Sequence, residues 1–354
     1  MNDSVSSAAG GAGAGARGRG AGPALLRGVD TDYLERSSEG PRPAAISGLL
    51  LPHWRAAGGG ADDSGTWLAG RTEMPTDAAA LAELAAQIQA DVDALRPTSL
   101  FTSSATAAAR QELELSDAYK IQRELRQLRQ ARGEICCGFK VGCTSPTIQA
   151  TFGLSQPVRA YLWKDEQFDS HAALPASKFR SLGIEGELGV YIVDSSPASV
   201  QDWVVEWTPV IELHHYVWDG TPPTSVELVS RNAIHAGVVA AANSRRRGLL
   251  KDIPAESICE VCVNGSTLGA EPLAELNAGE SFINGPVGTF SWLAEQLGGS
   301  EDWGTLTQAG SLVITSSPAG LYPVVPGDHV LVRCCGMEVS CTVVDRVGSA
   351  PAKM

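Results

Sequence analysis

The stretch that decides the fold is Gly183-Ile184-Glu185-Gly186-Glu187-Leu188-Gly189-Val190-Tyr191-Ile192-Val193. It is typical of a β-strand, in which successive side chains point to opposite faces of a sheet. Glu185 and Glu187 therefore share one face, and Ile184 and Leu188 lie on the other. A strand this apolar is expected to be buried on at least one face, so its carboxylates need a partner, and a hard divalent cation is the natural one. On the rim of a sheet, both carboxylates would instead be solvated.

A second apolar strand, predicted over 209–217, carries a third carboxylate, Glu212. A set made only of carboxylates favours Mg²⁺ or Mn²⁺ over Zn²⁺. Three protein oxygens leave three positions of an octahedron open, and a 2-oxo acid can take two of them through its carboxylate and its keto oxygen, with water in the third. His214 and His215 follow Glu212 directly, which leaves open that one of them lines the same cavity.

Lys140 lies within a predicted strand over 135–142 and is the next candidate. A Lys inside an apolar strand seldom lacks a partner, although its long stem also allows the ammonium group to reach the surface. Beside a metal-bound enolate, Lys140 would stabilise developing negative charge or move a proton. Cys259 and Cys262 form a C-x-x-C pattern, but in a strand these two residues face opposite sides, which disfavours a zinc site.

The composition of the chain excludes several classes of protein. The 354 residues carry a formal net charge of −13, which argues against nucleic-acid binding because that needs basic patches. No uninterrupted apolar run approaches the ~20 residues of a membrane-spanning helix. The first residues lack the apolar core of a signal peptide, and the eight cysteines include two adjacent pairs. We therefore expect reduced thiols in a cytoplasmic protein, with organelle targeting by the Arg-containing N-terminal stretch as an alternative.

The chain divides into four segments by composition and hydrophobic pattern. These are a low-complexity, disordered extension (1–75), a helical lead-in and linker (76–114), a β-rich domain (115–347) and a tail (348–354). The β-rich domain combines many short predicted strands, separated by turn signals, with few helices, so we expect an α+β fold that is mostly β. Its helices are predicted from Ser116, from Pro146 with Ser145 as the cap, and from Pro286 to Leu297.

The first of these helices carries a basic face, which we interpret as solvated. It is made up of Lys120, Arg123, Arg126, Arg129 and Arg132.

Taken in order, six stretches of the chain resemble the 2-oxo-acid hydratase/decarboxylase branch of the fumarylacetoacetate hydrolase superfamily. They are Asp117–Gln122, Gly138–Ser145, Ile184–Leu188, Ile211–Leu213, Ser311–Thr315 and Pro326–Asp328. The resemblance covers about residues 115–347 and implies that this segment is the catalytic domain.

This resemblance implies a fumarylacetoacetase C-terminal-like mixed β-roll with flanking helices, a metal in its cavity, and a homo-oligomer. The site residues that it implies are Glu185, Glu187 and Glu212 for Mg²⁺ (or Mn²⁺), Lys140 for the enolate, and Thr315 and Ser145 for the substrate. Known members hydrate 2-hydroxypenta-2,4-dienoate-type compounds or decarboxylate 4-oxalocrotonate-type ones, in the catabolism of aromatic ring-cleavage products. Hydration of 2-oxopent-4-enoate is our leading expectation, and decarboxylation is the second.

Details of the sequence sort the branches of this superfamily. The hydrolases use a His-Glu pair on an early helix, and no His lies between His53 and His171, which disfavours acylpyruvate hydrolysis. Glu212 also favours the hydratase/decarboxylase side, because the third ligand of the hydrolases is commonly Asp. Several members carry an acid where this chain has Val158, and a Gly where it has Ala160. The missing acid motivates one more alternative, a non-catalytic subunit that supports a catalytic partner.

Overall fold

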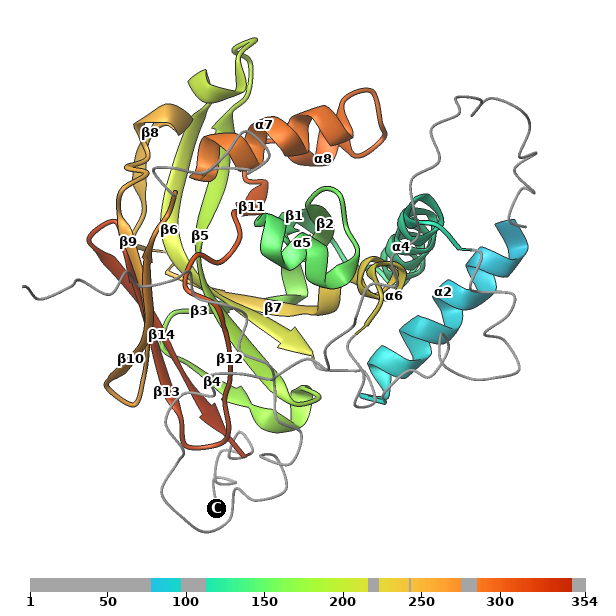
Figure 1. The fold of residues 1–354 in the computed structure, drawn as a ribbon, viewed down its shortest axis with the longest axis horizontal. Coiled ribbons are helices and arrows are strands. Elements are labelled where there is room, and N and C mark those ends of the chain that lie inside the picture. The colour runs from blue at the N-terminus through green and yellow to red at the C-terminus, as the bar shows by residue number, and fades with distance from the viewer. Residues whose placement is uncertain (1–77, 97–112, 216–222, 242, 275–284, 346–354) are drawn as a thin grey trace, which may run out of the picture.

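The computed structural model describes residues 78–96, 113–215, 223–241, 243–274 and 285–345 (Figure 1). The predicted disordered extension, most of the linker that follows the lead-in helix, and the predicted tail lie outside these residues.

Two β-sheets, of nine and five strands, form the body of the molecule (Figure 1). Across the larger sheet the order is β2 (Val158–Trp163), β1 (Cys136–Gly142), β11 (Leu312–Ile314), β5 (Leu182–Asp194), β6 (Val204–His215), β7 (His235–Ala240) and β3 (Gln167–Asp169), with β12 (Leu321–Pro323) paired to β5 and β8 (Arg246–Leu249) paired to β6. Across the smaller sheet it is β10 (Ser266–Pro272), β9 (Ile258–Val263), β13 (His329–Cys334), β14 (Met337–Val344) and β4 (Ala172–Pro175).

The two sheets pack face to face through the alternation that the sequence predicts. Ile184 and Leu188 of β5 are fully buried in the same core cluster as Val261 of β9 and Val332 of β13. A Cβ atom added at Gly186, between them, would lie 2.5 Å from a side-chain atom of Val261, so this glycine lets the sheets approach closely. The acidic residues of β5 therefore point to the face that is turned away from the smaller sheet.

Helices flank these sheets, and the predicted mixed β-roll is confirmed (Figure 1). Their bounds are α2 (Ala78–Asp93), α4 (Leu115–Ala131), α5 (Pro146–Phe152), α6 (Ser225–Ser230), α7 (Gly285–Leu297) and α8 (Trp303–Thr307). Ser145 caps α5 as predicted, because its hydroxyl accepts a hydrogen bond from the N–H of Ile148 at 3.3 Å. α2 packs on α4 through a small apolar cluster that includes Leu81, Ile88 and Ile121.

The basic face of α4 is only partly solvated, so its interpretation as a solvated face is wrong for two residues. The side chains of Arg126 and Arg129 are only 12% and 14% exposed. Arg126 pairs with the buried Asp302 and lies over the ring of Tyr161, and Arg129 lies over the ring of Trp163 at 4.1 Å. These partners are far away in the sequence, so a helix-face pattern alone does not reveal them.

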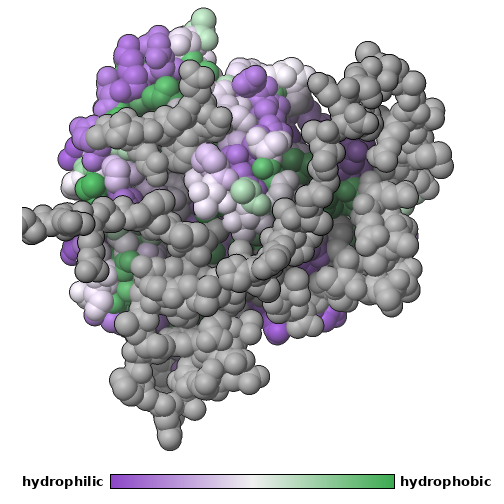
Figure 2. All heavy atoms as spheres, viewed as in Figure 1, coloured by the Kyte–Doolittle hydropathy of each residue, from purple (hydrophilic) through white to green (hydrophobic). Residues whose placement is uncertain are grey.

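Figure 2 shows the face seen in Figure 1, on which hydrophilic residues gather over the connection between β5 and β6 at the upper left.

Among the helices of the described residues, none has both the length and the apolar character needed to cross a membrane.

Candidate active site

The three predicted carboxylates come together on one face of the larger sheet. In the antiparallel pair of β5 and β6, Glu185 lies directly opposite Glu212, and Glu187 follows two residues later on the same face of β5. Glu187 and Glu212 are fully buried, whereas the side chain of Glu185 remains 20% exposed. The cluster is therefore open to solvent on the side of Glu185.

Lys140 reaches this cluster from another part of the sheet. It lies in β1, which β11 and β5 separate from β6, yet its Nζ lies 2.7 Å from Oε1 of Glu212. The sheet must therefore curl over the face that carries the carboxylates. Lys140 is 4% exposed, and its Nζ also donates a hydrogen bond to the carbonyl oxygen of Ala233 at 3.2 Å. The alternative in which its ammonium group reaches the surface is thus wrong.

The charges of this cluster shift one another's pKa values. Burial alone would raise the pKa of Glu212, but Lys140, His214 and the hydrogen bond from His235 hold it well below its ordinary value. Burial alone would lower the pKa of Lys140, but the three carboxylates raise it. Burial, followed by the charges of Glu212 and Glu185, raises the pKa of Glu187 well above its ordinary value. At neutral pH, Lys140 and Glu212 therefore form a charged pair, and Glu187 is the carboxyl group that most readily keeps a proton.

Of the two adjacent histidines, His214 lines the cluster and His215 does not. Nε2 of His214 lies 2.9 Å from Oε2 of Glu185 and 3.6 Å from Oε2 of Glu212. His214 shares its face of β6 with Glu212 because the two residues are two positions apart. The ring of His215 instead accepts a hydrogen bond from the backbone N–H of Arg180 at 3.2 Å.

His235, at the start of β7, is a site residue that sequence reasoning missed. Its Nδ1 donates to Oε1 of Glu212 at 2.7 Å, and its Nε2 lies 3.9 Å from Oε2 of Glu166. Glu166 in turn pairs with Arg129 at 2.6 Å. His235 therefore holds Glu212 in place on the side opposite to the solvent, as a residue behind a metal ligand commonly does.

A left-handed turn leads into His235. Asn232, Ala233 and Ile234 have φ values of 54°, 47° and 56°, a conformation that residues other than Gly rarely adopt. The side chain of Asn232 holds this turn, because it accepts from the N–H of Tyr161 and donates to the carbonyl of Tyr161, both at 2.8 Å. Since Ala233 accepts from Lys140 and His235 binds Glu212, this strained turn positions two groups of the site.

The two residues expected to bind substrate lie in loops, and both hydroxyl groups already have backbone partners. Ser145 caps α5, and Thr315, just after β11, donates from its Oγ1 to the carbonyl of Leu188 at 3.2 Å. Next to Thr315, Ser316 has a φ of 84°, and its N–H donates to Oε2 of Glu187 at 2.8 Å. The loop after β11 is thus tied to the carboxylate cluster through Ser316.

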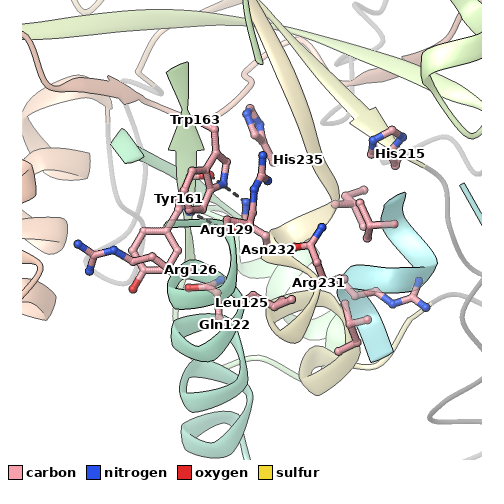
Figure 3. Close-up of a pocket in the computed structure, with 14 residues that line it drawn as sticks. Gln122, Leu125, Arg126, Arg129, Tyr161, Trp163, His215, Arg231, Asn232 and His235 are labelled. Carbon is pink, nitrogen blue, oxygen red and sulfur yellow. Dashed lines mark hydrogen bonds between the residues drawn. The ribbon is translucent and has the colours of Figure 1, made fainter. Parts of the chain in front are cut away.

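A small cavity of about 30 Å³ lies behind His235, between α2, α4 and the turn at Asn232. Figure 3 shows Arg129 and His235 side by side next to Trp163, with Arg126 next to Tyr161. This volume holds about one water molecule, so the cavity is too small for an organic acid. We therefore place the functional site at the carboxylates and not in this cavity.

The cluster contains a donor set that fits a divalent cation. One ligand atom each of Glu185, Glu212 and His214 lie within 4.8 Å of one another. Oε2 of Glu212 is buried and makes no hydrogen bond to any residue that the structure describes. Since buried polar atoms are normally satisfied, this oxygen is available to an ion. The eight cysteines are all free, and within the described ranges neither Cys259 nor Cys262 belongs to a group of potential metal ligands.

The sequence of this chain is similar to those of several known enzymes. No protein-family model matches it. It is 25% identical over 238 residues to a 4-oxalocrotonate decarboxylase of Pseudomonas putida, a match that covers 64% of this chain and 84% of the relative. It is 24% identical over 249 residues to a 2-oxo-hept-4-ene-1,7-dioate hydratase of Escherichia coli, covering 66% of this chain and 88% of the relative.

The comparison of structures finds the same kind of protein as the comparison of sequences. The structure of 4-oxalocrotonate decarboxylase from Pseudomonas putida G7, complexed with magnesium and adipate, matches with a TM-score of 0.63 and 22% identity, and the match covers 75% of this chain and 98% of that one. In sequence and in fold, the chain thus resembles the 2-oxo-acid hydratase/decarboxylase branch of the fumarylacetoacetate hydrolase superfamily, as its motifs predict.

Proposed function

We propose that this protein is a metal-dependent lyase that acts on small 2-oxo or 2-hydroxydienoic acids, with hydration of 2-hydroxypenta-2,4-dienoate as its leading reaction. The observation that carries the proposal is the convergence of Glu185, Glu187, Glu212 and Lys140 at one buried cluster. The names of the curated relatives, which are hydratases and decarboxylases of such acids, support the substrate class.

In this proposal, Glu185, Glu187 and Glu212 hold a divalent ion, Mg²⁺ or Mn²⁺. When bound there, the ion would supply Lewis-acid polarisation of the carboxylate and keto oxygens of the substrate. Lys140, whose Nζ lies 2.7 Å from Glu212, supplies a positive charge and hydrogen-bond donors at the cluster. Its ammonium group stabilises negative charge as it develops on the substrate oxygen.

An apolar wall beside Lys140 suits the hydrocarbon part of a dienoic acid. Ala160 lies directly opposite Lys140 in the pairing of β1 and β2, and Val158 shares the same face. Both are buried in an apolar cluster with Ala118 and Val229. Val158 thus replaces the acid of several family members by an apolar contact, which supports a substrate that is uncharged at this end.

Decarboxylation of 4-oxalocrotonate is the second candidate. A 4-oxalocrotonate decarboxylase is among the curated relatives, and the fold comparison returns the structure of a 4-oxalocrotonate decarboxylase. Hydration and decarboxylation both pass through a dienolate, which the same charges stabilise.

The test is a pair of ultraviolet assays on the purified full chain, one with freshly generated 2-hydroxypenta-2,4-dienoate and one with 4-oxalocrotonate. Each is run with Mg²⁺, with Mn²⁺ and with a chelator. The variant Glu185→Ala should abolish turnover, whereas Glu338→Ala, at a side chain that is 64% exposed, should leave it unchanged.

Loss of the dienoate absorbance that needs the metal and Glu185 supports the hydratase. Turnover of 4-oxalocrotonate alone would move the assignment to the decarboxylase. Metal binding without turnover of either compound would contradict both reactions and leave an unfamiliar substrate or a non-catalytic subunit.

A further inference from the structure

We infer that His214 is a nitrogen ligand of the metal in this site, so that the site selects a first-row transition ion such as Mn²⁺ over Mg²⁺. The inference rests on the proposed function in one respect: it takes for granted that a divalent ion binds at the carboxylate cluster. The family pattern implies only carboxylate ligands, and His214 departs from it.

The position of His214 is that of a ligand. Its Nε2 lies 2.9 Å from Oε2 of Glu185 and 3.6 Å from Oε2 of Glu212. Two donors on neighbouring corners of an octahedron with bonds of ~2.1 Å are about 3 Å apart, and opposite donors are about 4.2 Å apart. The two distances from Nε2 of His214 lie close to or between these values, so the three groups, which are grouped within 4.8 Å, can hold a single ion.

The burial of the His214 ring is a second observation that points to a bound ion. The side chain of His214 is only 3% exposed, and neither of its ring nitrogens forms a hydrogen bond with any residue in the described part of the chain. A buried imidazole normally has a hydrogen-bond partner. Oε2 of Glu212 faces His214 at 3.6 Å. An ion between His214, Glu185 and Glu212 would give this buried imidazole the partner that it lacks.

The remaining oxygen of Glu212 is already occupied. Lys140 and His235 both lie 2.7 Å from its Oε1, so this carboxylate can offer Oε2 alone to an ion. Lys140 and His235 therefore fix the orientation of the Glu212 carboxylate, and its Oε2 faces Nε2 of His214 at 3.6 Å.

The nitrogen changes which ion the site prefers. Mg²⁺ takes oxygen ligands almost exclusively, whereas imidazole suits the first-row transition ions, whose affinity for nitrogen donors rises from Mn²⁺ towards Cu²⁺. A site of carboxylates alone would not discriminate in this way. With His214 among the ligands, Mn²⁺ should bind about tenfold or more tightly than Mg²⁺.

The experiment compares two metals in three metal-stripped proteins: the wild type, His214→Val, and His329→Val as a control at an exposed residue. Calorimetric titrations with Mn²⁺ and with Mg²⁺ give the affinities. Electron spin echo modulation of the Mn²⁺-loaded wild type reports directly whether a ¹⁴N atom is bound. We expect a ¹⁴N signal that His214→Val abolishes, an at least tenfold loss of Mn²⁺ affinity in that variant, and a Mg²⁺ affinity close to that of the wild type.

Equal affinities for both metals, without a ¹⁴N signal, would overturn the inference and leave the proposed function intact. Binding of neither metal by the wild type would overturn both. If His214→Val does not fold, as circular dichroism would reveal, the ¹⁴N signal of the wild type still decides the question.

Discussion

The pair of Lys140 and Glu212 offers the sharpest test of the site, because it predicts a large loss of stability from one substitution. Lys140→Met keeps most of the apolar stem but removes the ammonium group that lies 2.7 Å from Glu212. Both side chains are at most 5% exposed, so the carboxylate cannot turn to water and keeps only neighbouring histidines, His235 at 2.7 Å among them, as partners.

The expected magnitude follows from this burial. Breaking a buried ion pair by removing one partner costs about 3–5 kcal/mol, because an uncompensated charge is left behind. In a domain of this size, that corresponds to a fall of roughly 6–20 °C in Tm. Lys251→Met is the matched control: Lys251 lies 2.8 Å from Asp202, but the two side chains are 49% and 39% exposed, so water replaces the lost partner and stability should barely change.

The assay is urea denaturation in the presence of a chelator, followed by circular dichroism. The double variant Lys140→Met/Glu212→Gln should recover part of the loss, because the remaining partner is then neutral. Small and equal effects of Lys140→Met and Lys251→Met would refute the reasoning, since they would mean that Glu212 is not held as a buried charge.

The remaining predictions concern packing, the strained turn and a buried thiol. Gly186→Ala should lower the free energy of unfolding by about 1–3 kcal/mol, because its Cβ would lie 2.5 Å from a valine of the facing sheet. In the control Gly304→Ala, the added Cβ has nothing within 4 Å, so this variant should not be destabilised. Equal urea midpoints of the two variants would contradict this packing. Asn232→Ala removes both 2.8 Å bonds to the backbone of Tyr161 and should cost about 1–3 kcal/mol and lower kcat, and an unchanged kcat would show that the turn does not position the site. Burial raises the pKa of Cys341 to about 12, so the native thiol keeps its proton between pH 8 and pH 10. In this pH range, alkylation of Cys341 by iodoacetamide, followed by mass spectrometry, should be slow in the native protein and fast only in denaturant. Labelling of the native protein at the denatured rate would refute the burial.

The sequence allows the carboxylates and Lys140 to be predicted because their signals are local. Alternation along one strand suffices to place Glu185 and Glu187 on a common face, and an apolar strand with a single charged residue suffices to single out Lys140. The fold class follows from the same patterns, and the structure confirms it.

Other parts of the site depend on geometry that no local pattern encodes. His235 meets Glu212 only because β6 and β7 change register between Leu213 and His214, and because a left-handed turn precedes His235. Arg126 is largely shielded from solvent through its pairing with Asp302, a residue that lies 176 positions later in the chain. Contacts of this kind depend on the tertiary fold, and that is where the prediction of a solvated face failed.

The short strand β11 has a consequence for the biosynthesis of this protein. Leu312–Ile314 pairs with β1 on one side and with β5 on the other, so it joins the strand of Lys140 to the strand of the glutamates. A ribosome finishes Glu212 about 100 residues before it reaches β11, a delay of roughly 5–20 s at ordinary rates of translation. Throughout that interval the apolar edges of β1 and β5 have no partner, and exposed edges of this kind promote aggregation. The larger sheet can therefore be completed only after β11 has been made, when nearly nine-tenths of the chain has left the ribosome's active site.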